Sequence, residues 1–379
     1  MSRALRILIA HNVPKKRTGG MSRLMGLLHD QVVLAGHSVE YFCADDVPRW
    51  VRGFPARLAF SFYALQHAVR AARGGNPFDV INVHEPSGAA VSLLKWGAGR
   101  PQVVVTSYGI ERRGWERLME EVNLGRDRLR LRTRLTYPAT VLWQAKIALK
   151  LADHVFCSNM EDFEYLKSRF HIAGSRITRI QSGADHLYAS ASQNRDYSRA
   201  ETLLFSGTWL NRKGVLDLVP AVERLLGRYS KLRFVVLNPG VPEAKVKACF
   251  AKAASPRVSC IEAEPETGIA CAVAAADIFV LPSLFEGTPL TLIEAMFGGL
   301  PIVTTDTCGM KDVIEDGGNG LLVPTRSPEA IVNAVERLLD NSTLREQLGR
   351  AARSDAVNRY GWQSVAEPVR RLYEEICSG

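Results

Sequence analysis

Two glutamates on either side of a Gly-Thr-Pro turn are the residues of this chain best suited to chemistry. Glu286 precedes the turn, and Glu294 follows eight positions later in a predicted helix. The apolar run 278–283 just before them predicts a buried strand. A strand, a polar loop and a helix N-terminus form a corner whose unpaired amides bind anions, and a proline fits the first helical turn. We therefore expect a diphosphate at this corner, sugar hydroxyls at Glu294, and Glu286 facing whatever lies beyond the phosphate.

A second set of residues lies between a predicted strand and a predicted helix, from 206 to 215. Gly207 follows the strand, and Arg212 and Lys213 stand next to Gly214. Positive charge is unfavourable at a helix N-terminus, so a functional role explains these cations better than a solvated helix start. An arginine binds phosphate with two hydrogen bonds, and both cations would neutralise charge that grows on a phosphate leaving group.

These motifs resemble those of the family 4 retaining glycosyltransferases of the GT-B fold. The signature of that family is a Glu, seven residues and a second Glu at such a corner, which Glu286 and Glu294 match. Its Gly-Arg, four residues, Lys-Gly pattern is matched at Gly207, Lys213 and Gly214, while Thr208 stands in place of the Arg. We expect Arg212 to supply the missing guanidinium. The likeness continues through 298–305 and 315–324, and it is weakest from 110 to 140.

The resemblance implies an α/β protein with two doubly wound Rossmann-like domains facing across a cleft. It implies that a hexosyl unit moves from a nucleotide sugar to an acceptor hydroxyl with retention at the anomeric carbon. It also implies no permanently bound cofactor and no obligatory metal. The catalytic residues would be Glu286, Lys213 and Arg212. The residues implied to bind the donor are Glu294 at the ribose, Thr288 and Leu290 through amides at the phosphate, and Gly287, Thr291, Gly207, Gly19 and Gly20.

Four residues in the first half are candidates for ligand contacts: Gly19 and Gly20 with the donor, and His84 and Tyr108 with the sugar or the acceptor. The pair Gly19 and Gly20 is also explained by a plain loop, and both interpretations stay open. His84 ends the third predicted strand, where a hydrogen-bonded structural role is favoured over a contact with the acceptor. The family carries a His where Tyr108 ends the fourth strand. Tyrosine is no base near pH 7, so we expect Tyr108 to affect acceptor handling more than catalysis.

Strands and helices alternate along all 379 residues, which predicts parallel sheets in two domains. We place the domains at 1–190 and 198–360, with a small polar linker over 188–196. The resemblance implies that the last helix, within 361–379, packs back on the first domain. The predicted strands are 5–10, 39–44, 79–84, 103–108, 154–159 and 177–182 in the first half, and 202–207, 233–238, 258–263, 278–283, 301–306 and 320–324 in the second.

Charge is distributed unevenly. Residues 1–200 hold 29 Lys and Arg against 17 Asp and Glu, whereas residues 201–379 hold 19 against 22. A basic first half favours an anionic membrane surface or a phosphate-bearing acceptor, with a solvated face as an equal alternative. Nucleic acid is not favoured, because no basic motif interleaved with aromatic residues is present. In 126–134 every second residue is an arginine, and the residues between and after them, through Leu135, are mostly apolar. As an extended segment this is either a membrane-surface element or a solvated loop.

The seven scattered cysteines include no C-x-x-C pair, which is typical of a reduced cytosolic protein. We expect a cytoplasmic enzyme, peripheral at the inner face of the membrane if its acceptor is lipid-linked. A UDP-sugar is favoured over a GDP-sugar because it is commoner in the family, and cell-surface glycan or glycolipid synthesis is the expected role. Alternatives are a non-catalytic GT-B subunit that binds a nucleotide sugar, a transferase for a small-molecule acceptor, and a phosphorylase or epimerase.

Overall fold

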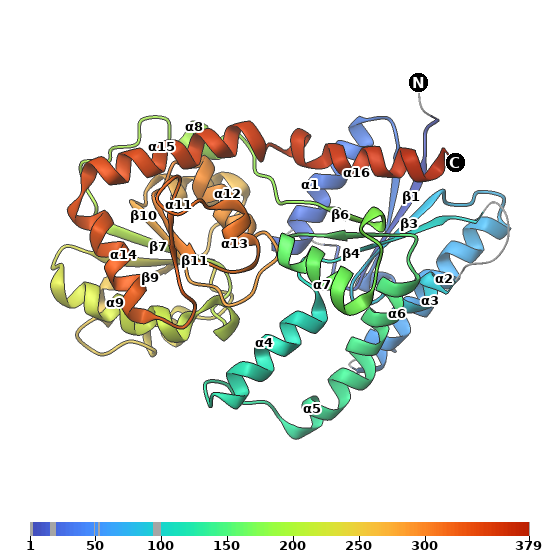
Figure 1. Ribbon diagram of the computed structural model, residues 1–379, viewed down its shortest axis with the longest axis horizontal. Helices are drawn as coiled ribbons and strands as arrows, with labels where there is room; N and C mark the ends of the chain where they lie inside the picture. The colour runs from blue at the N-terminus through green and yellow to red at the C-terminus, as the bar shows by residue number, and fades with distance from the viewer. Residues whose placement is uncertain (1–2, 16–19, 49, 52–53, 94–99, 379) are drawn as a thin grey trace. The chain divides into compact units, whose positions relative to one another are not determined.

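The computed structural model describes residues 3–15, 20–48, 50–51, 54–93 and 100–378 (Figure 1). The chain forms two compact units. Unit 1 holds the residues up to Gln181 together with the C-terminal segment from Trp362, and unit 2 holds Ser182–Gly361. Among the described residues, no helix combines the length and the apolar character needed to cross a bilayer.

Unit 1 contains a six-stranded parallel sheet in the order β2-β1-β3-β4-β5-β6. All six strands predicted for the first half are confirmed, most of them with earlier C-terminal ends. Residues beyond those ends, such as Tyr108, leave the sheet and enter loops. The strands are β1 Arg6–His11, β2 Ser38–Cys43, β3 Val80–His84, β4 Gln102–Thr106, β5 His154–Cys157 and β6 Ile177–Arg179.

Helices cover both faces of this sheet because the central strands are apolar on both sides. On β1, Ile7 and Ile9 pack with Leu28, while Leu8 and Ala10 pack with Phe60 on the opposite face. The last helix packs on the first one. The helices of unit 1 are α1 Gly20–Leu34, α2 Phe54–Arg73, α3 Ala89–Ser92, α4 Glu111–Asn123, α5 Leu131–Tyr137, α6 Trp143–Leu151, α7 Met160–Phe170 and α16 Trp362–Cys377.

Unit 2 contains a second parallel sheet, in the order β12-β11-β10-β7-β8-β9. The six strands predicted for the second half are also confirmed. Two doubly wound sheets flanked by helices confirm the predicted fold class. The strands are β7 Thr202–Ser206, β8 Arg233–Leu237, β9 Val258–Ile261, β10 Ile278–Leu281, β11 Ile302–Thr305 and β12 Leu321–Val323.

Two pairs of helices pack most closely in unit 2: α9 against α14 and α12 against α15. The helix α9 carries Val215, Leu218, Val222 and Leu225 on its buried face, the spacing expected of an amphipathic helix. The helices of unit 2 are α8 Leu187–Ala191, α9 Val215–Arg228, α10 Glu243–Lys247, α11 Glu266–Ala274, α12 Leu290–Phe297, α13 Cys308–Val313, α14 Pro328–Asp340 and α15 Ser342–Arg359.

The segment 188–196 differs from the predicted linker. It starts within α8, which packs on α11 and α12, and Tyr188 is fully buried. Arg195 donates hydrogen bonds to the backbone oxygens of Gly298, at 2.7 Å, and Val273, at 2.9 Å. The boundary between the units therefore follows Gln181 rather than residue 190. The small and polar residues of this segment predict a linker, because sequence composition does not show the hydrogen bonds of Arg195 to the ends of two helices.

The alternation of arginines in 126–134 is that of an extended segment, but the structure is extended only in part of it. The helix α5 begins at Leu131 and continues through a π-helical turn, Pro138–Leu142, into α6. Stacking of Tyr137 on Trp115 of α4, with ring centroids 4.7 Å apart, holds this helix. That contact joins residues distant in sequence, so local periodicity does not disclose it.

Candidate active site

The strand order of unit 2 brings two of the predicted motifs together. Strands β8 and β9 lie on one side of β7, and β11 and β12 lie on the far side of β10. The chain therefore reverses its winding direction between β7 and β10. Ligands of doubly wound sheets bind outside the carboxyl ends of the strands at such a point. The loops that follow these two strands contain Lys213 and Glu286.

A buried ion pair joins the two loops. The Lys213 Nζ atom lies 2.8 Å from Glu286 Oε1, and the two side chains are only 12% and 9% exposed. The backbone reinforces this link, because the Leu284 amide donates to the Arg212 carbonyl at 2.8 Å. The Lys213 side chain also lies against Gly207, where an added Cβ would be 3.6 Å from Nζ. The structure thus brings together Gly207, Lys213 and Glu286, with Arg212 exposed beside them.

The charge state of Glu286 follows from its neighbours. Burial acts to raise the pKa of this carboxyl group. The positive charges of Lys213 and Arg212 outweigh burial, so the pKa of Glu286 lies below its ordinary value. Glu286 is therefore an anion at neutral pH, held between a buried cation and a more exposed one.

Two glycines allow the loop after β10 to approach its neighbours closely. Gly214 has a φ of 76°, and an added Cβ would lie 1.9 Å from the Pro282 carbonyl oxygen. Gly309, in α13, leaves so little room that an added Cβ would lie 1.7 Å from the Gly287 carbonyl oxygen. Both distances are far below van der Waals contact. The loop with Glu286 and Gly287 is therefore packed against backbone on two sides.

The helix α12 begins at the corner where the sequence predicts anion binding. Pro289 is its N-cap rather than its first helical residue, and the helix begins at Leu290. The amides of Leu290 and Thr291 accordingly lie in the first turn, where intrahelical acceptors are lacking. The Thr291 hydroxyl is shielded from solvent and has no hydrogen-bond partner among the described residues. The Thr288 carbonyl accepts a hydrogen bond from Ser182 Oγ at 2.6 Å, which fixes the loop just before the helix.

Glu294 is the fifth residue of α12, and its side chain is 2% exposed. The opposite end of α12 is held by two arginines that the sequence did not mark as important. Arg195 and Arg353 both donate to the Gly298 carbonyl, at 2.7 and 2.9 Å. Neither arginine belongs to a recognisable motif, so no sequence signal pointed to this clamp.

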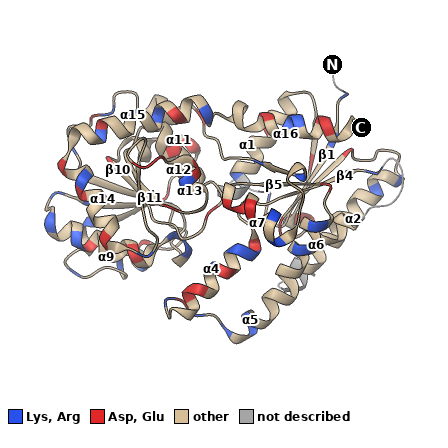
Figure 2. Ribbon diagram, in the orientation of Figure 1, with Lys and Arg blue, Asp and Glu red and all other residues tan. Residues whose placement is uncertain are grey.

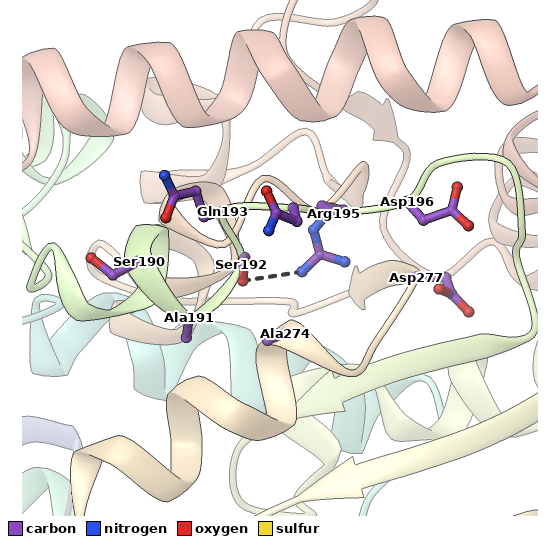
Figure 3. A pocket seen from close by; sticks show the side chains of 9 residues that line it. Ser190, Ala191, Ser192, Gln193, Arg195, Asp196, Ala274 and Asp277 are labelled. Atoms are coloured by element: carbon purple, nitrogen blue, oxygen red, sulfur yellow. Dashed lines mark hydrogen bonds between the residues drawn. The ribbon is translucent and has the colours of Figure 1, made fainter.

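A pocket of about 350 Å³ lies beside Arg195 (Figure 3). Its lining comes from the segment 190–196 together with Ala274 and Asp277, and it includes none of the predicted donor residues. We therefore do not assign the donor to it. In the part of the chain that the structure describes, no three His, Cys, Asp or Glu side chains are grouped so that they could hold a metal ion.

Unit 1 has its own point of reversal, between β1 and β3, and it gathers aromatic polar side chains there. His11 ends β1 and His84 ends β3, with ring centroids 6.0 Å apart, and Tyr108 lies 5.4 Å from His84. His29 of α1 is 6.4 Å from His84. The structure thus brings His84 and Tyr108 together and adds His11 and His29. Gly20 begins α1, and Gly19 lies outside the described residues.

The His84 ring is held neutral. Burial, followed by the nearby His29 and His11, places its pKa well below the ordinary value. Neither ring nitrogen has a hydrogen-bond partner among the described residues, which argues against a hydrogen-bonded structural role. Burial also raises the pKa of Tyr108, so its hydroxyl stays protonated. These groups can hydrogen-bond to a hydroxyl. Because Tyr108 stays protonated, it cannot act as an anionic base that takes up the proton of that hydroxyl.

The carboxyl group of Glu85 should make thermal stability depend on pH. Burial, followed by the charge of Glu111, raises its pKa from 4.5 to about 8. When folding raises the pKa of an acid, the fold is favoured at any pH below the pKa that the group has in the unfolded chain. This contribution to stability is lost as the pH rises toward 8. Wild-type melting temperatures should therefore fall relative to those of Glu85→Gln between pH 5 and pH 8. A difference between the two proteins that stays constant over this range would contradict the assignment.

Comparison with known families agrees with this architecture. The family model described as Glycosyltransferase Family 4 matches residues 18–186, and the model described as Glycosyl transferases group 1 matches residues 190–355. The phosphatidyl-myo-inositol mannosyltransferase of Mycobacterium leprae is 26% identical over 355 residues, covering 93% of this chain and 85% of the relative. The MMP alpha-(1->4)-mannosyltransferase of Mycolicibacterium hassiacum is 29% identical over 332 residues, covering 87% and 77%.

Among solved structures, the sucrose-phosphate synthase of Thermosynechococcus elongatus shares the fold. It superposes with a TM-score of 0.77 at 19% identity and covers 99% of both chains. The two family models together account for most of the sequence, one for each half. The protein therefore belongs to family 4 of the glycosyltransferases, which have the GT-B fold.

Proposed function

We propose that this glycosyltransferase moves a hexosyl unit from a nucleotide sugar to an acceptor hydroxyl, with retention of configuration at the anomeric carbon. The observation that carries the proposal is the buried ion pair between Lys213 and Glu286, 2.8 Å long, where the winding of the unit 2 sheet reverses. An anion and a cation in one shielded place can stabilise the two opposite charges that develop during glycosyl transfer. Positive charge develops on the sugar ring, and negative charge develops on the departing phosphate.

Each side chain then has a separate task. The amides of Leu290 and Thr291 and the Thr291 hydroxyl bind the diphosphate, and Glu294 binds the ribose hydroxyls. Glu286 aligns the sugar and stabilises its positive charge, while Lys213 and Arg212 carry charge on the leaving group.

The bond from the anomeric carbon to the phosphate oxygen breaks, and the new bond to the acceptor oxygen forms on the same face. The departing phosphate oxygen takes the acceptor proton, so no side-chain base is required. Since cations of the chain carry the leaving-group charge, we propose that no metal ion is obligatory.

The acceptor is proposed to bind unit 1, with His84 and Tyr108 on the sugar side. One of the matched relatives is named for phosphatidyl-myo-inositol as its acceptor and for mannosyl transfer. We propose by analogy a lipid-linked hydroxyl acceptor, a mannosyl or related hexosyl donor, and a cytoplasmic location at the inner face of the membrane. UDP and GDP both remain candidate carriers.

A second candidate is a subunit that binds a nucleotide sugar without transferring it. Two departures from the family pattern favour it. Thr208 is exposed where an arginine is expected, and Tyr108 replaces a histidine. A small-molecule acceptor is a further alternative for the enzyme itself. Release of nucleoside diphosphate by the purified chain separates an enzyme from a binding subunit.

Donor binding should raise the thermal stability of the purified chain. A ligand at about 100 times its Kd stabilises a protein by roughly 2.7 kcal/mol, which shifts the melting temperature by several degrees. We expect one of UDP-glucose and GDP-mannose to produce this shift and to be hydrolysed slowly in the presence of EDTA. The sugar released from such slow turnover should be the α-anomer. A shift with neither donor would count against the proposed site, and a shift without turnover would favour the binding subunit.

A further inference from the structure

The helix that runs from α5 through the π turn into α6 has an exposed apolar line. Leu131, Leu135 and Trp143 are 70%, 67% and 54% exposed. The opposite side of α6 is anchored, because Ala145, Ala148 and Leu149 are buried in the core of unit 1. Solvent-exposed large apolar side chains gathered on one element mark an interaction surface rather than scattered exposure.

The π turn keeps these residues in register. Leu131 and Leu135 are four positions apart, one turn of an α-helix, but Trp143 lies eight positions beyond Leu135. In a regular α-helix the line would drift around the axis over such a distance. The turn Pro138–Leu142 has i to i+5 hydrogen bonding and holds more residues per turn, so it reduces the drift. Leu131, Leu135 and Trp143 therefore face a common side.

Basic residues surround this line. Six Lys and Arg and no Asp or Glu occur from 128 to 152. In Figure 2 the charged residues of helix α5 are all basic, whereas helix α4 carries both acidic and basic residues. On α4, Arg112 pairs with Glu116 at 3.0 Å and Arg117 with Glu120 at 3.1 Å. By contrast, the exposed arginines around α5 form no ion pair within the described part of the chain. These are Arg128, Arg130, Arg132 and Arg134.

We propose that Leu131, Leu135 and Trp143 with these four arginines form a docking face for an anionic lipid bilayer. The arginines would meet acidic headgroups, and the leucines and the tryptophan would enter the boundary between headgroups and acyl chains. A second copy of the chain fits this face poorly, because a symmetric contact would bring two sets of unpaired cations together. The inference concerns a surface of unit 1 and deepens the lipid-acceptor part of the proposed function without depending on the transfer reaction.

Vesicle binding tests the docking face directly. The full chain should sediment with phosphatidylcholine vesicles that contain phosphatidylserine, and much less with phosphatidylcholine alone or at high salt. Each arginine near an anionic surface contributes roughly fivefold in affinity, so changing all four to Gln should weaken binding by at least about a hundredfold. The variant Leu131→Ser/Leu135→Ser should weaken binding at least about tenfold. Leu34→Ser is the matched control, since this leucine of α1 is 78% exposed and lies outside the docking face.

Three results would overturn the inference. They are failure of the wild type to bind acidic vesicles, an equal loss in Leu34→Ser, and a dimer that Leu131→Ser/Leu135→Ser abolishes without any vesicle binding. The donor-induced thermal shift is measured on the same samples. If vesicle binding is absent but the donor-induced thermal shift is present, only the docking face is refuted. If the thermal shift is absent but vesicle binding is present, only the proposed donor site is refuted.

Discussion

Replacing Glu286 or Lys213 with alanine should lower sugar transfer at least about a hundredfold, as expected when a charge stabiliser is lost from a shielded site. In Lys213→Ala the Glu286 carboxylate remains buried at 9% exposure without its closest cation. Because burial acts to raise this pKa and the lowering effect of Lys213 is removed, the pKa of Glu286 should rise in this variant. The measurement is kcat at saturating donor, together with the thermal unfolding of each variant.

A structural role for the ion pair must be separated from a catalytic one. Breaking a buried pair on one side destabilises a protein by about 3–5 kcal/mol, whereas replacing both partners can be nearly neutral. The double variant Lys213→Gln/Glu286→Gln should therefore recover much of the thermal stability that either single variant loses. Its turnover should remain at least about a hundredfold below that of the wild type, because neither charge is present. Recovery of turnover in the double variant would show that the pair only supports the fold.

Adding one methyl group at Gly309 should disrupt donor binding. In Gly309→Ala the new Cβ would lie 1.7 Å from the Gly287 carbonyl oxygen and 2.8 Å from the Thr288 Cα. Both obstacles are backbone atoms, so the loop that carries Glu286 must move. Overpacking of this kind costs about 1–3 kcal/mol of stability, or more. We expect donor affinity, measured by titration calorimetry, to fall at least about tenfold, since a displaced loop no longer aligns Glu286 with α12.

Gly227 provides the matched control for this substitution. It lies in α9 of the same unit, and an added Cβ would meet nothing within 4 Å. Gly227→Ala should leave donor affinity unchanged and raise stability by about 0.5–1 kcal/mol, because alanine is the better helix former. If both variants bind donor like the wild type, the contact between α13 and the loop does not position the site.

The sequence predicted the twelve strands because central strands of parallel sheets are apolar along their whole length. Runs such as 278–281 cannot be solvated on either face, so they must lie between layers of helices. Their order in each sheet is a different matter. Nothing local to 202–206 or 278–281 states that these two segments are neighbours. The resemblance to a family supplied the two motifs, and the structure supplied the reason for their meeting, which is the reversal between β7 and β10.

The features that sequence reasoning missed all depend on distant contacts. His11 and His29 join His84 through tertiary packing of β1 and α1, and neither has a spacing that marks it. Arg195 was hidden in a small polar stretch because its hydrogen-bond acceptors Val273 and Gly298 lie 78 and 103 residues later in the chain. The arginines of 126–134 alternate with a period of two, yet the second half of this segment is helical, and the stack of Tyr137 on Trp115 holds that helix. Local periodicity gives way wherever such contacts are stronger than propensity.

The clamp of Arg195 and Arg353 on Gly298 bears on how the enzyme uses α12. Its C-terminal end is fixed by two cations, and its N-terminal loop is fixed by Ser182 and by backbone packing at Gly309. The peptide dipoles of the first turn are thus already oriented before the proposed phosphate ligand binds. In water, solvent molecules must turn toward a growing charge at each reaction, and that reorganisation is a large part of the barrier. Because α12 is fixed at both ends, its dipoles are oriented when the protein folds and need no reorientation during the reaction.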